Sequence, residues 1–462
     1  MARIRRVGLT ILLAGFFIGV ASGHKVSGRF EAPLPLELLF GGAGISVGIT
    51  AVMLAFTANE PSQLSNGRSL FTISPFTASL LRTTVQWLFV AAFILAIATG
   101  LVGKQAQAEN FATVFVWAIW LKGVAIIAAL IGSPWRVLSP WRAIYDGLVR
   151  VEGEPIALFD RYPNRLGIWP ALGGYLLWIG IIENLTIVPR SPSATALLLV
   201  IYASIMIAGG ITFGPQWFRQ ADALAVLYRL FERVAPFGIT RTDTGGYHIR
   251  VRPPWRAAAQ PVRRLAVTAF VIAAVYTVSF DGFTSTPEFQ SLLFTIRNSF
   301  DIGLSVSIIL YLTGFVIFIK VFIAIIGIVQ RVAGRSLSEW QTATLAFAPT
   351  ILPIAVAYEI AHNYSFVVAS ISQLPTTLWP FIGSGQAPTI DLLVWLTLPV
   401  YWGSQVLLIV AGHLVAVVAA HSVAVARYET AQAARRAHIP LVVLMIGYTM
   451  LSLWIISRPV TS

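Results

Sequence analysis

The sequence predicts an all-α fold, a polytopic bundle of transmembrane helices. Among its 462 residues, 57% are hydrophobic and only 11% are charged, whereas a soluble domain carries about a quarter charged residues to solvate its surface. The apolar residues also come in runs of about twenty, the length that a helix needs to cross the hydrocarbon core of a bilayer. A soluble fold would expose several such runs to water, so we expect an integral protein of the cell membrane.

The first apolar run covers residues 7–21. Three arginines precede it, and Ala21-Ser22-Gly23 follow it directly. A basic start, a short apolar stretch and small residues at the cleavage positions are typical of a secretory signal. Residues 1–23 are therefore predicted to be either a cleaved signal peptide or an uncleaved first helix. Cleavage after Gly23 would make His24 the first residue of the mature chain.

Ten further runs predict a single transmembrane domain of about ten spans over residues 24–462. They cover residues 38–56, 85–102, 111–131, 166–188, 194–213, 265–280, 302–329, 345–371, 392–426 and 439–456. Two of these runs are too long for one straight span, and they contain Pro353 and Pro399 respectively. Because proline removes a backbone donor and kinks a helix, each of these two helices is predicted to break or tilt at its proline.

Arginines gather in four of the connections between runs. The connection after residue 213 carries nine of them, residues 132–165 carry five, and the connections 331–335 and 427–436 mark two more. If every run crosses once, all four connections lie on one side. Since Lys and Arg favour the cytoplasmic side, we predict that these loops are cytoplasmic, that they face anionic lipid head groups, and that the C-terminus is outside. The basic residues that give the net charge of +13 are thus expected to contact lipid head groups, and we expect no binding of nucleic acid.

The basic loop 214–262 mixes apolar and basic residues, as in Val226-Leu227-Tyr228-Arg229-Leu230-Phe231. This pattern is typical of an amphipathic helix on the membrane surface. A small helical cap packed on neighbouring loops fits the same pattern, and the sequence does not choose between the two.

Three histidines lie inside apolar runs, where an ionisable group is costly and therefore a candidate for function. His362 lies in the run 345–371, and His413 and His421 lie in the run 392–426. Imidazole suits Zn, Cu, Fe and haem iron, so these three are the candidate metal ligands, with His362 and His413 on adjacent helices. His413 and His421 are separated by ~12 Å of helix rise, too far for one ion. The alternative is that the imidazoles only hydrogen-bond neighbouring helices. The absence of cysteine excludes thiolate sites and disulfides.

Acidic residues add further candidates. Asp281 and Glu183 close their runs on the predicted outer side, where Asp281 and His362 are the candidate catalytic pair. Glu359 precedes His362 by three residues, a spacing that points both side chains the same way and matches one half of a di-iron site. The second half of such a site is absent from the sequence.

Two lysines, Lys122 and Lys320, fall within runs. Lys320 could pair with an acid or line a water path, and the alternative for such residues is that the ammonium extends toward the head groups. His24, if exposed by cleavage, would offer an amine and an imidazole as a copper chelate.

Four segments together resemble a family of bacterial and archaeal multi-span membrane proteins named fenitrothion hydrolase-like. They are Ser139-Pro140-Trp141-Arg142-Ala143-Ile144, Ser279-Phe280-Asp281-Gly282, Pro353-Ile354-Ala355-Val356-Ala357-Tyr358 running on to Ala361-His362, and Ala411-Gly412-His413 running on to Ala420-His421. The resemblance covers nearly the whole chain and implies hydrolysis of an organophosphate ester. Two positions depart from the family pattern: Lys25 follows His24 in place of glycine, and Glu359 stands at an apolar position.

Three functions are compatible with this sequence. The first is a metal- or haem-dependent membrane enzyme that works from the outer face through His362, His413 and Asp281, because a hydrolase needs an activated water. The second is a transporter or metal-handling permease that moves an ion or small molecule past the same histidines, with its helices broken at prolines. The third is a scaffold subunit whose histidines only pack helices.

Overall fold

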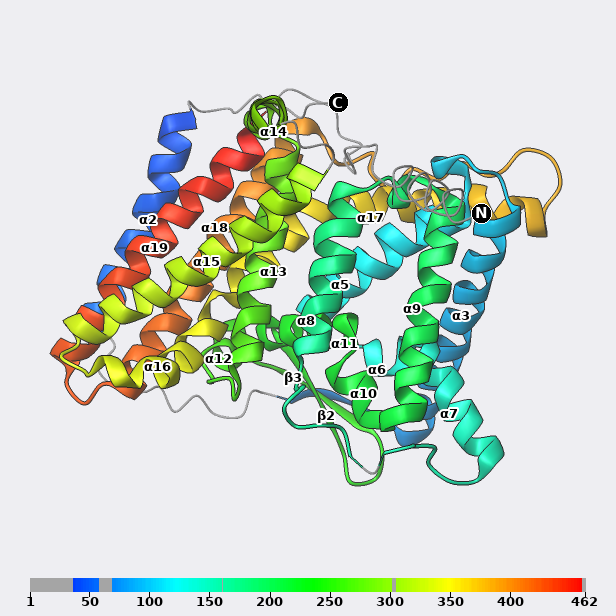
Figure 1. The fold of residues 1–462 in the computed structure, drawn as a ribbon, viewed down its shortest axis with the longest axis horizontal. Coiled ribbons are helices and arrows are strands. Elements are labelled where there is room, and N and C mark those ends of the chain that lie inside the picture. The colour runs from blue at the N-terminus through cyan, green and yellow to red at the C-terminus, as the bar shows by residue number, and fades with distance from the viewer. Residues whose placement is uncertain (1–35, 58–68, 160, 301–304, 459–462) are drawn as a thin grey trace.

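The computed structural model describes residues 36–57, 69–159, 161–300 and 305–458 (Figure 1). The leader at residues 1–23 and His24 lie outside the described residues. Within them the chain is almost entirely helical, and the helices are arranged as a bundle. This confirms the predicted all-α polytopic architecture.

Nine helical segments in the described ranges are long and apolar enough to cross a membrane. They are α2 (Leu36–Thr57), α3 (Pro75–Val102), the continuous α4–η2–α5 segment (Phe111–Leu130), α9 (Pro192–Phe213), α13 (Leu265–Thr284), α15 (Ser305–Val332), the segment Leu337–Ile382 that ends in α17, α18 (Leu398–Arg427) and α19 (Ala431–Ser457). The chain is therefore a membrane-embedded protein, and the predicted runs correspond to these helices with one exception.

The exception is the predicted span at residues 166–188. There the structure has a short α-helix, α8 (Trp169–Tyr175), which continues as the π-helical segment η3 (Leu176–Glu183). At ~1.5 Å per residue, these fifteen residues cover ~22 Å, less than the ~30 Å hydrocarbon core. Pro170 in the first turn and Asn184 at the end set these limits. The segment packs against α11 and α13 inside the protein, where a short helix is tolerated.

Two of the long segments are composite. Phe111–Leu130 consists of α4 (Phe111–Thr113), η2 (Val114–Gly123) and α5 (Val124–Leu130), and Leu337–Ile382 consists of η6 (Leu337–Glu339), α16 (Trp340–Phe347), η7 (Ala348–Ile351) and α17 (Leu352–Ile382). The remaining elements are short. The helices are α6 (Trp135–Leu138), α7 (Pro140–Glu152), α10 (Pro215–Gln220), α11 (Ala223–Phe231), α12 (Pro254–Ala258) and α14 (Pro287–Phe300), with 3-10 turns η1 (Gln107–Glu109), η4 (Val188–Arg190) and η5 (Glu232–Val234). The strands are β1 (Ser69–Ile73), β2 (Phe237–Arg241) and β3 (Tyr247–Val251). Figure 1 shows α7, α10, α12, α16 and the strands at one edge of the bundle.

The basic loop 214–262 folds into a compact cap rather than a surface helix. Its helix α11 is buried on most of its circumference, from Ala223 to Phe231, because its apolar residues pack against α5, α8 and η5. The loop also contains an antiparallel hairpin, and the sheet order is β1-β3-β2, with Ile249 opposite both Phe71 and Ile239. The sequence analysis did not predict this sheet. Five-residue strands at a membrane edge leave no long alternating pattern.

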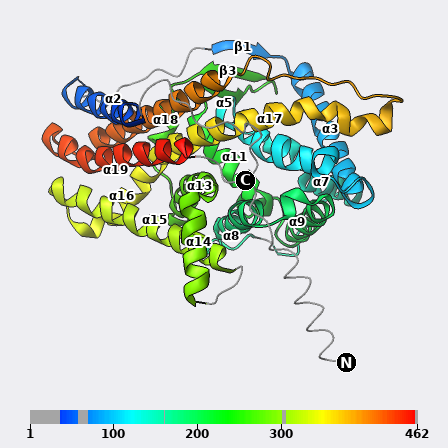
Figure 2. The ribbon, with the colours of Figure 1, turned by 90° about the horizontal axis from the view of Figure 1, so that it is seen from above.

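The centre of the bundle is formed by η2, α13 and α17. Most of their apolar windows are buried within the protein, at 78%, 83% and 89%, against 22–28% for the peripheral α2, α3 and α15. Figure 2 shows α17 running across the middle, between the group of α2, α18 and α19 and the group of α3, α7 and α9. It packs against η2, α13 and α18. Polar side chains on α17 therefore face protein rather than lipid.

Both prolines lie in the first turn of a helix that follows an interruption of the predicted run. Pro353 lies in the first turn of α17, and the 3-10 turn η7 separates α17 from α16. Pro399 lies in the first turn of α18, which begins at Leu398, and residues 392–397 of the predicted run are not helical. Proline is well accommodated in a first turn because there is no backbone acceptor there for its missing N–H. Each run is therefore interrupted at its proline, as the sequence analysis predicted.

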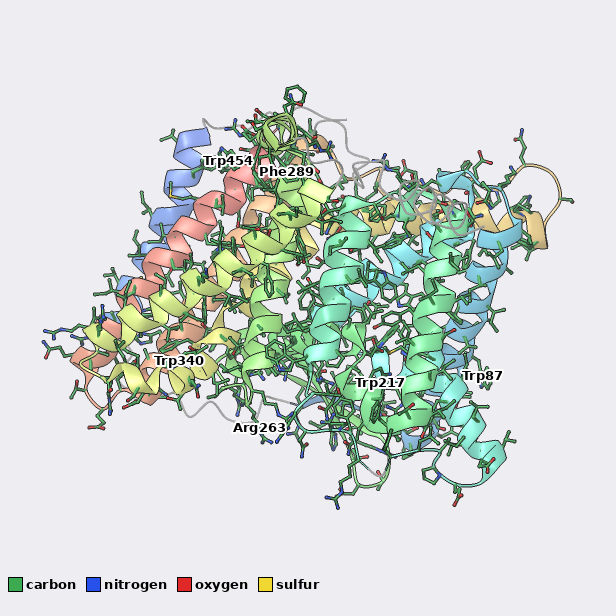
Figure 3. The ribbon with its side chains drawn as sticks, viewed as in Figure 1. Trp87, Trp217, Arg263, Phe289, Trp340 and Trp454 are labelled. Carbon is green, nitrogen blue, oxygen red and sulfur yellow. The ribbon has the colours of Figure 1, made fainter. Side chains whose placement is uncertain are left out.

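The outer surface of the bundle is apolar at mid-height and aromatic near its edges. Figure 3 shows Trp87 of α3 on the outside of the bundle, Trp340 and Arg263 at the edge of the basic loops, and Trp454 at the opposite edge. Trp87 is 62% exposed. Exposed apolar side chains are stable only against lipid tails, and tryptophans favour the interface. The surface thus matches a bilayer-spanning bundle.

The close contact between α17 and α18 depends on Gly412. A Cβ atom built at this position would overlap the Cβ of Ala357 and lie 2.8 Å from the carbonyl oxygen of Pro353. We expect Gly412→Ala to lower the free energy of unfolding by about 1–3 kcal/mol, because the two helices must separate. Thermal unfolding in detergent measures this, with Gly403→Ala on the same helix as control, since nothing lies within 4 Å of Gly403. Equal melting temperatures for both variants would contradict the prediction.

Candidate functional site

A lysine lies between two glutamates in the interior of the bundle. Lys122 Nζ is 2.9 Å from Glu183 Oε1 and 3.5 Å from Glu359 Oε1. The side chains of Lys122 and Glu359 are each 8% exposed and that of Glu183 is 13% exposed. Ion pairs shielded from water in this way are screened little by salt. These three residues are referred to as the charged cluster.

The three members of the charged cluster come from three central elements. Lys122 is near the end of the π-helical segment η2, Glu183 ends the π-helical segment η3, and Glu359 lies in the buried first third of α17. π-Helical turns are rare and are found frequently at functional sites. Lys122 and Glu183 therefore both lie where their helices depart from regular α-helical geometry.

A second pair of ionisable residues lies next to the charged cluster. His362 Nε2 on α17 is 3.5 Å from Asp281 Oδ2 on α13, which forms an ion pair when the imidazole is protonated. Their side chains are 11% and 19% exposed. Asp281, Lys122 and Glu359 line one small cavity. The pair and the charged cluster therefore form a single polar site.

The cavity is small and has both polar and apolar walls. Asn184, Thr277 and Tyr175 line it together with the charged residues, and its volume is about 10 Å³. That space is enough for about one water molecule. Asn184 donates from its Nδ2 to the carbonyl oxygen of Ile179, 2.7 Å away, at the end of η3. The cavity therefore has room for one water-sized particle beside Asp281 and Glu359.

The site contains more acid than base. Lys122 contributes one positive charge, while Glu183, Glu359 and Asp281 contribute three carboxylates. A buried carboxylate without compensation costs several kcal/mol. Full ionisation with a neutral His362 leaves a net charge of −2, because +1 − 3 = −2. Protons or small cations must offset this charge for the bundle to be stable.

The other two predicted ligands have different surroundings. His413 is buried, and its Nδ1 is 2.8 Å from the carbonyl oxygen of Ile409 on its own helix. His421 packs its ring 5.1 Å from that of His438 on α19. Throughout the described ranges no group of three or more His, Asp and Glu side chains is placed to hold a metal ion. A metal site formed by His362, His413 and His421 stays a prediction without a ligand cluster to support it.

The sequence analysis named most members of the site but not its centre. Asp281, His362, Glu183 and Glu359 were each candidates, and the structure brings these four together around Lys122. Lys122 was noted only as a lysine within a run. The signal that could have identified it is its position in the middle of the run 111–131. A lysine so far from either head-group region is better placed to pair with an acid than to reach the head groups. Lys320, by contrast, is exposed on α15.

A second buried carboxylate, Asp222, was missed by the sequence analysis. The indole N–H groups of Trp135 and Trp141 donate to its Oδ2 at 2.8 and 2.9 Å, and the hydroxyl of Tyr202 donates to its Oδ1 at 3.1 Å. Its Oδ1 also caps α11 by accepting from the backbone N–H of Leu224 at 3.0 Å. Burial raises the pKa of Asp222, while the two indole donors act to lower it. Because its oxygens are fully occupied by donors, Asp222 is a structural anchor.

Comparisons of the chain with protein-family models, with curated proteins and with solved structures found no match. A proposal for the function therefore rests on the geometry and charge of the site.

Proposed function

We propose that this protein is a membrane transporter that exchanges protons for a small monovalent cation at the charged cluster and the Asp281–His362 pair. The observation that carries this proposal is the excess of buried carboxylates over lysine in the middle of the bundle. Intramembrane acids are costly and mark ion pathways. This site needs a counter-charge that its own residues do not supply.

Protons and cations compete for the same carboxylates. When Glu359 and Asp281 are protonated, the site is neutral, with Lys122 paired to Glu183. When one of these two protons leaves, the site carries a charge of −1. One monovalent cation of similar size to a water molecule then balances that charge in the cavity, which has room for one such particle. The two occupants exclude each other, and that exclusion is the basis of exchange.

The arrangement on α17 provides a path for the proton. Glu359 and His362 are three residues apart, so they lie on one face of the helix about one turn from each other. Glu359 contacts Lys122, and His362 contacts Asp281. An imidazole can accept a proton on one ring nitrogen and release one from the other, which suits a group that relays protons between two carboxylates.

We expect Glu359→Gln to abolish cation-driven proton movement. The purified protein is reconstituted into proteoliposomes that contain a pH-sensitive dye and hold an imposed pH gradient, and Na⁺, K⁺ or Li⁺ is added outside. The wild-type protein should collapse the gradient with at least one cation, and Glu359→Gln should not, because the amide cannot bind a proton or attract a cation. The matched control is Glu109→Gln, which removes a 59% exposed carboxylate.

Two results would overturn this proposal. The first is a wild-type protein that gives no dye response with any of the three cations. The second is a folded Glu359→Gln variant that exchanges at the wild-type rate. Retention of exchange by Glu109→Gln shows that the loss is specific to the buried acid.

Hydrolysis of an organophosphate ester is the second candidate, and the Asp281–His362 pair favours it. A carboxylate that orients an imidazole enables that imidazole to act as a general base toward water. The resemblance to the fenitrothion hydrolase-like family suggests the substrate class. Release of a nitrophenol from an aryl organophosphate triester by the same proteoliposomes, lost in His362→Ala, supports hydrolysis. Exchange without any such release leaves the transporter as the function.

A further inference from the structure

A cavity at the edge of the basic loops is independent of the charged cluster. It lies among α6, α7, α10 and α11 and has a volume of about 500 Å³, within the range of small-molecule sites. These helices are at the lower edge of the bundle in Figure 1, and Trp217 in Figure 3 marks the position of α10. The cavity is therefore at the level where lipid head groups meet water.

Four arginines line this cavity. Arg136 and Arg142 come from α6 and α7, and Arg219 and Arg229 come from α10 and α11. The lining contains one acid, Glu232. Its lining groups thus carry a net charge of +3, because 4 − 1 = 3. This cavity, which is lined by Arg136, Arg142, Arg219 and Arg229, is referred to as the arginine cavity.

Three of the four arginines lack a carboxylate partner among the described residues. Arg142 Nε is 3.6 Å from Asp146 Oδ2, whereas none of the ion pairs found in the described ranges includes Arg136, Arg219 or Arg229. Arg229 donates instead to the backbone carbonyl oxygen of Arg219 at 3.0 Å. Burial and the neighbouring Arg219 lower the pKa of Arg229, although Asp222 and Glu232 act to raise it. An anion in the cavity would relieve this repulsion.

A buried hydroxyl provides a second and independent sign of a ligand. Ser139 lines the cavity and is only 3% exposed, yet its Oγ has no hydrogen-bond partner among the described residues. Buried polar groups are almost always satisfied. The unused hydroxyl and the guanidinium groups together match a ligand with several acceptor oxygens.

We infer that the arginine cavity binds a phosphate group. Guanidinium presents a planar fork that pairs with phosphate oxygens through two parallel hydrogen bonds, and a phosphate has enough oxygens for several arginines and Ser139 at once. The group can belong to an anionic phospholipid head group or to a soluble phosphate. Either ligand would hold α6, α7, α10 and α11 against one another.

The test is thermal unfolding of the detergent-purified full chain with four additives at equal ionic strength. They are sodium chloride, inorganic phosphate, a short-chain phosphatidylglycerol and the phosphatidylcholine of the same chain length. We expect phosphate or phosphatidylglycerol to raise the melting temperature above the chloride and phosphatidylcholine values, because a ligand that binds only the folded state stabilises it. A response to phosphatidylglycerol alone identifies a lipid site, and a response to inorganic phosphate identifies a site open to soluble ligands.

The variants separate binding from folding. Arg136 and Arg219 are exposed, so Arg136→Gln with Arg219→Gln should leave the ligand-free melting temperature unchanged while weakening binding by about tenfold per arginine. Arg229→Lys keeps the buried charge but loses the fork, and it should also weaken binding. Arg150→Gln, on an exposed residue of α7 outside the cavity, is the control. No shift with inorganic phosphate or phosphatidylglycerol, or an equal shift in the double variant, would overturn the inference.

Discussion

Replacement of Lys122 by methionine is expected to destabilise the protein by about 3–5 kcal/mol. The change leaves Glu183 and Glu359 buried without the ammonium group that lies 2.9 and 3.5 Å from them, and breaking a buried pair from one side has a cost of this size. Methionine is similar in length to lysine, so the loss of packing is small. Thermal or chemical unfolding of the purified protein, followed by tryptophan fluorescence, measures the effect.

The surface provides a matched control for Lys122→Met. Lys104 and Glu109 are also 2.8 Å apart, but their side chains are 71% and 59% exposed. Because water replaces the lost partner of an exposed pair, Lys104→Met should not change the melting temperature measurably. If both lysine variants unfold at the same temperature, the buried pair does not stabilise the bundle.

A compensated variant separates stability from function. Adding Glu183→Gln to Lys122→Met removes one charge of each sign, so most of the lost stability should return. Cation-driven proton movement should remain absent, because the counter-charge that sets the occupancy of Glu359 and Asp281 has gone. Recovery of both properties would show that Lys122 and Glu183 only hold helices together.

Replacement of Asp222 by alanine is expected to cost at least about 3 kcal/mol. The change leaves the buried N–H groups of Trp135 and Trp141 without an acceptor, and each unsatisfied buried donor costs about 1–3 kcal/mol. Loss of the cap on α11 adds about 1 kcal/mol. Urea unfolding of the purified protein gives the free energy.

The contributions at Asp222 are separable by a milder variant. Asp222→Asn keeps one acceptor oxygen and the cap, so its stability should fall between wild type and Asp222→Ala. Asp146→Ala, at a partly exposed acid whose partner Arg142 is 3.6 Å away, should have little effect. If Asp222→Ala unfolds like Asp146→Ala, the indole donors are not anchored by this carboxylate.

The spans were predictable from the sequence because an apolar run must fold into a helix wherever water is absent. The shorter helix at α8 and η3 was not, since the limits set by Pro170 and Asn184 become visible only when its partners α11 and α13 are in place. The hairpin of β2 and β3 was hidden for a similar reason. Its strands are short, and β3 also pairs with β1, which precedes it by more than a hundred and fifty residues.

The site was predictable residue by residue but not as an arrangement. Hydrophobic context identified Asp281, Glu359 and His362 as unusual. It did not show that Glu359 faces Lys122 while His362 faces Asp281, because that pairing depends on how η2 and α13 pack on α17. Asp222 gave no signal at all. It stands in a polar loop, where an aspartate is ordinary.

The π-wound turns at η2 and η3 give the bundle a way to change register. A π turn closes its hydrogen bond one residue later than an α turn, so it stores one extra residue within a helix whose ends stay fixed. Conversion of such a turn to α winding rotates the residues beyond it around the helix axis. Lys122 and Glu183 stand near the ends of these two turns. A modest rewinding would therefore rotate these two side chains about their helix axes and change the distance between the ammonium of Lys122 and the carboxylate of Glu183.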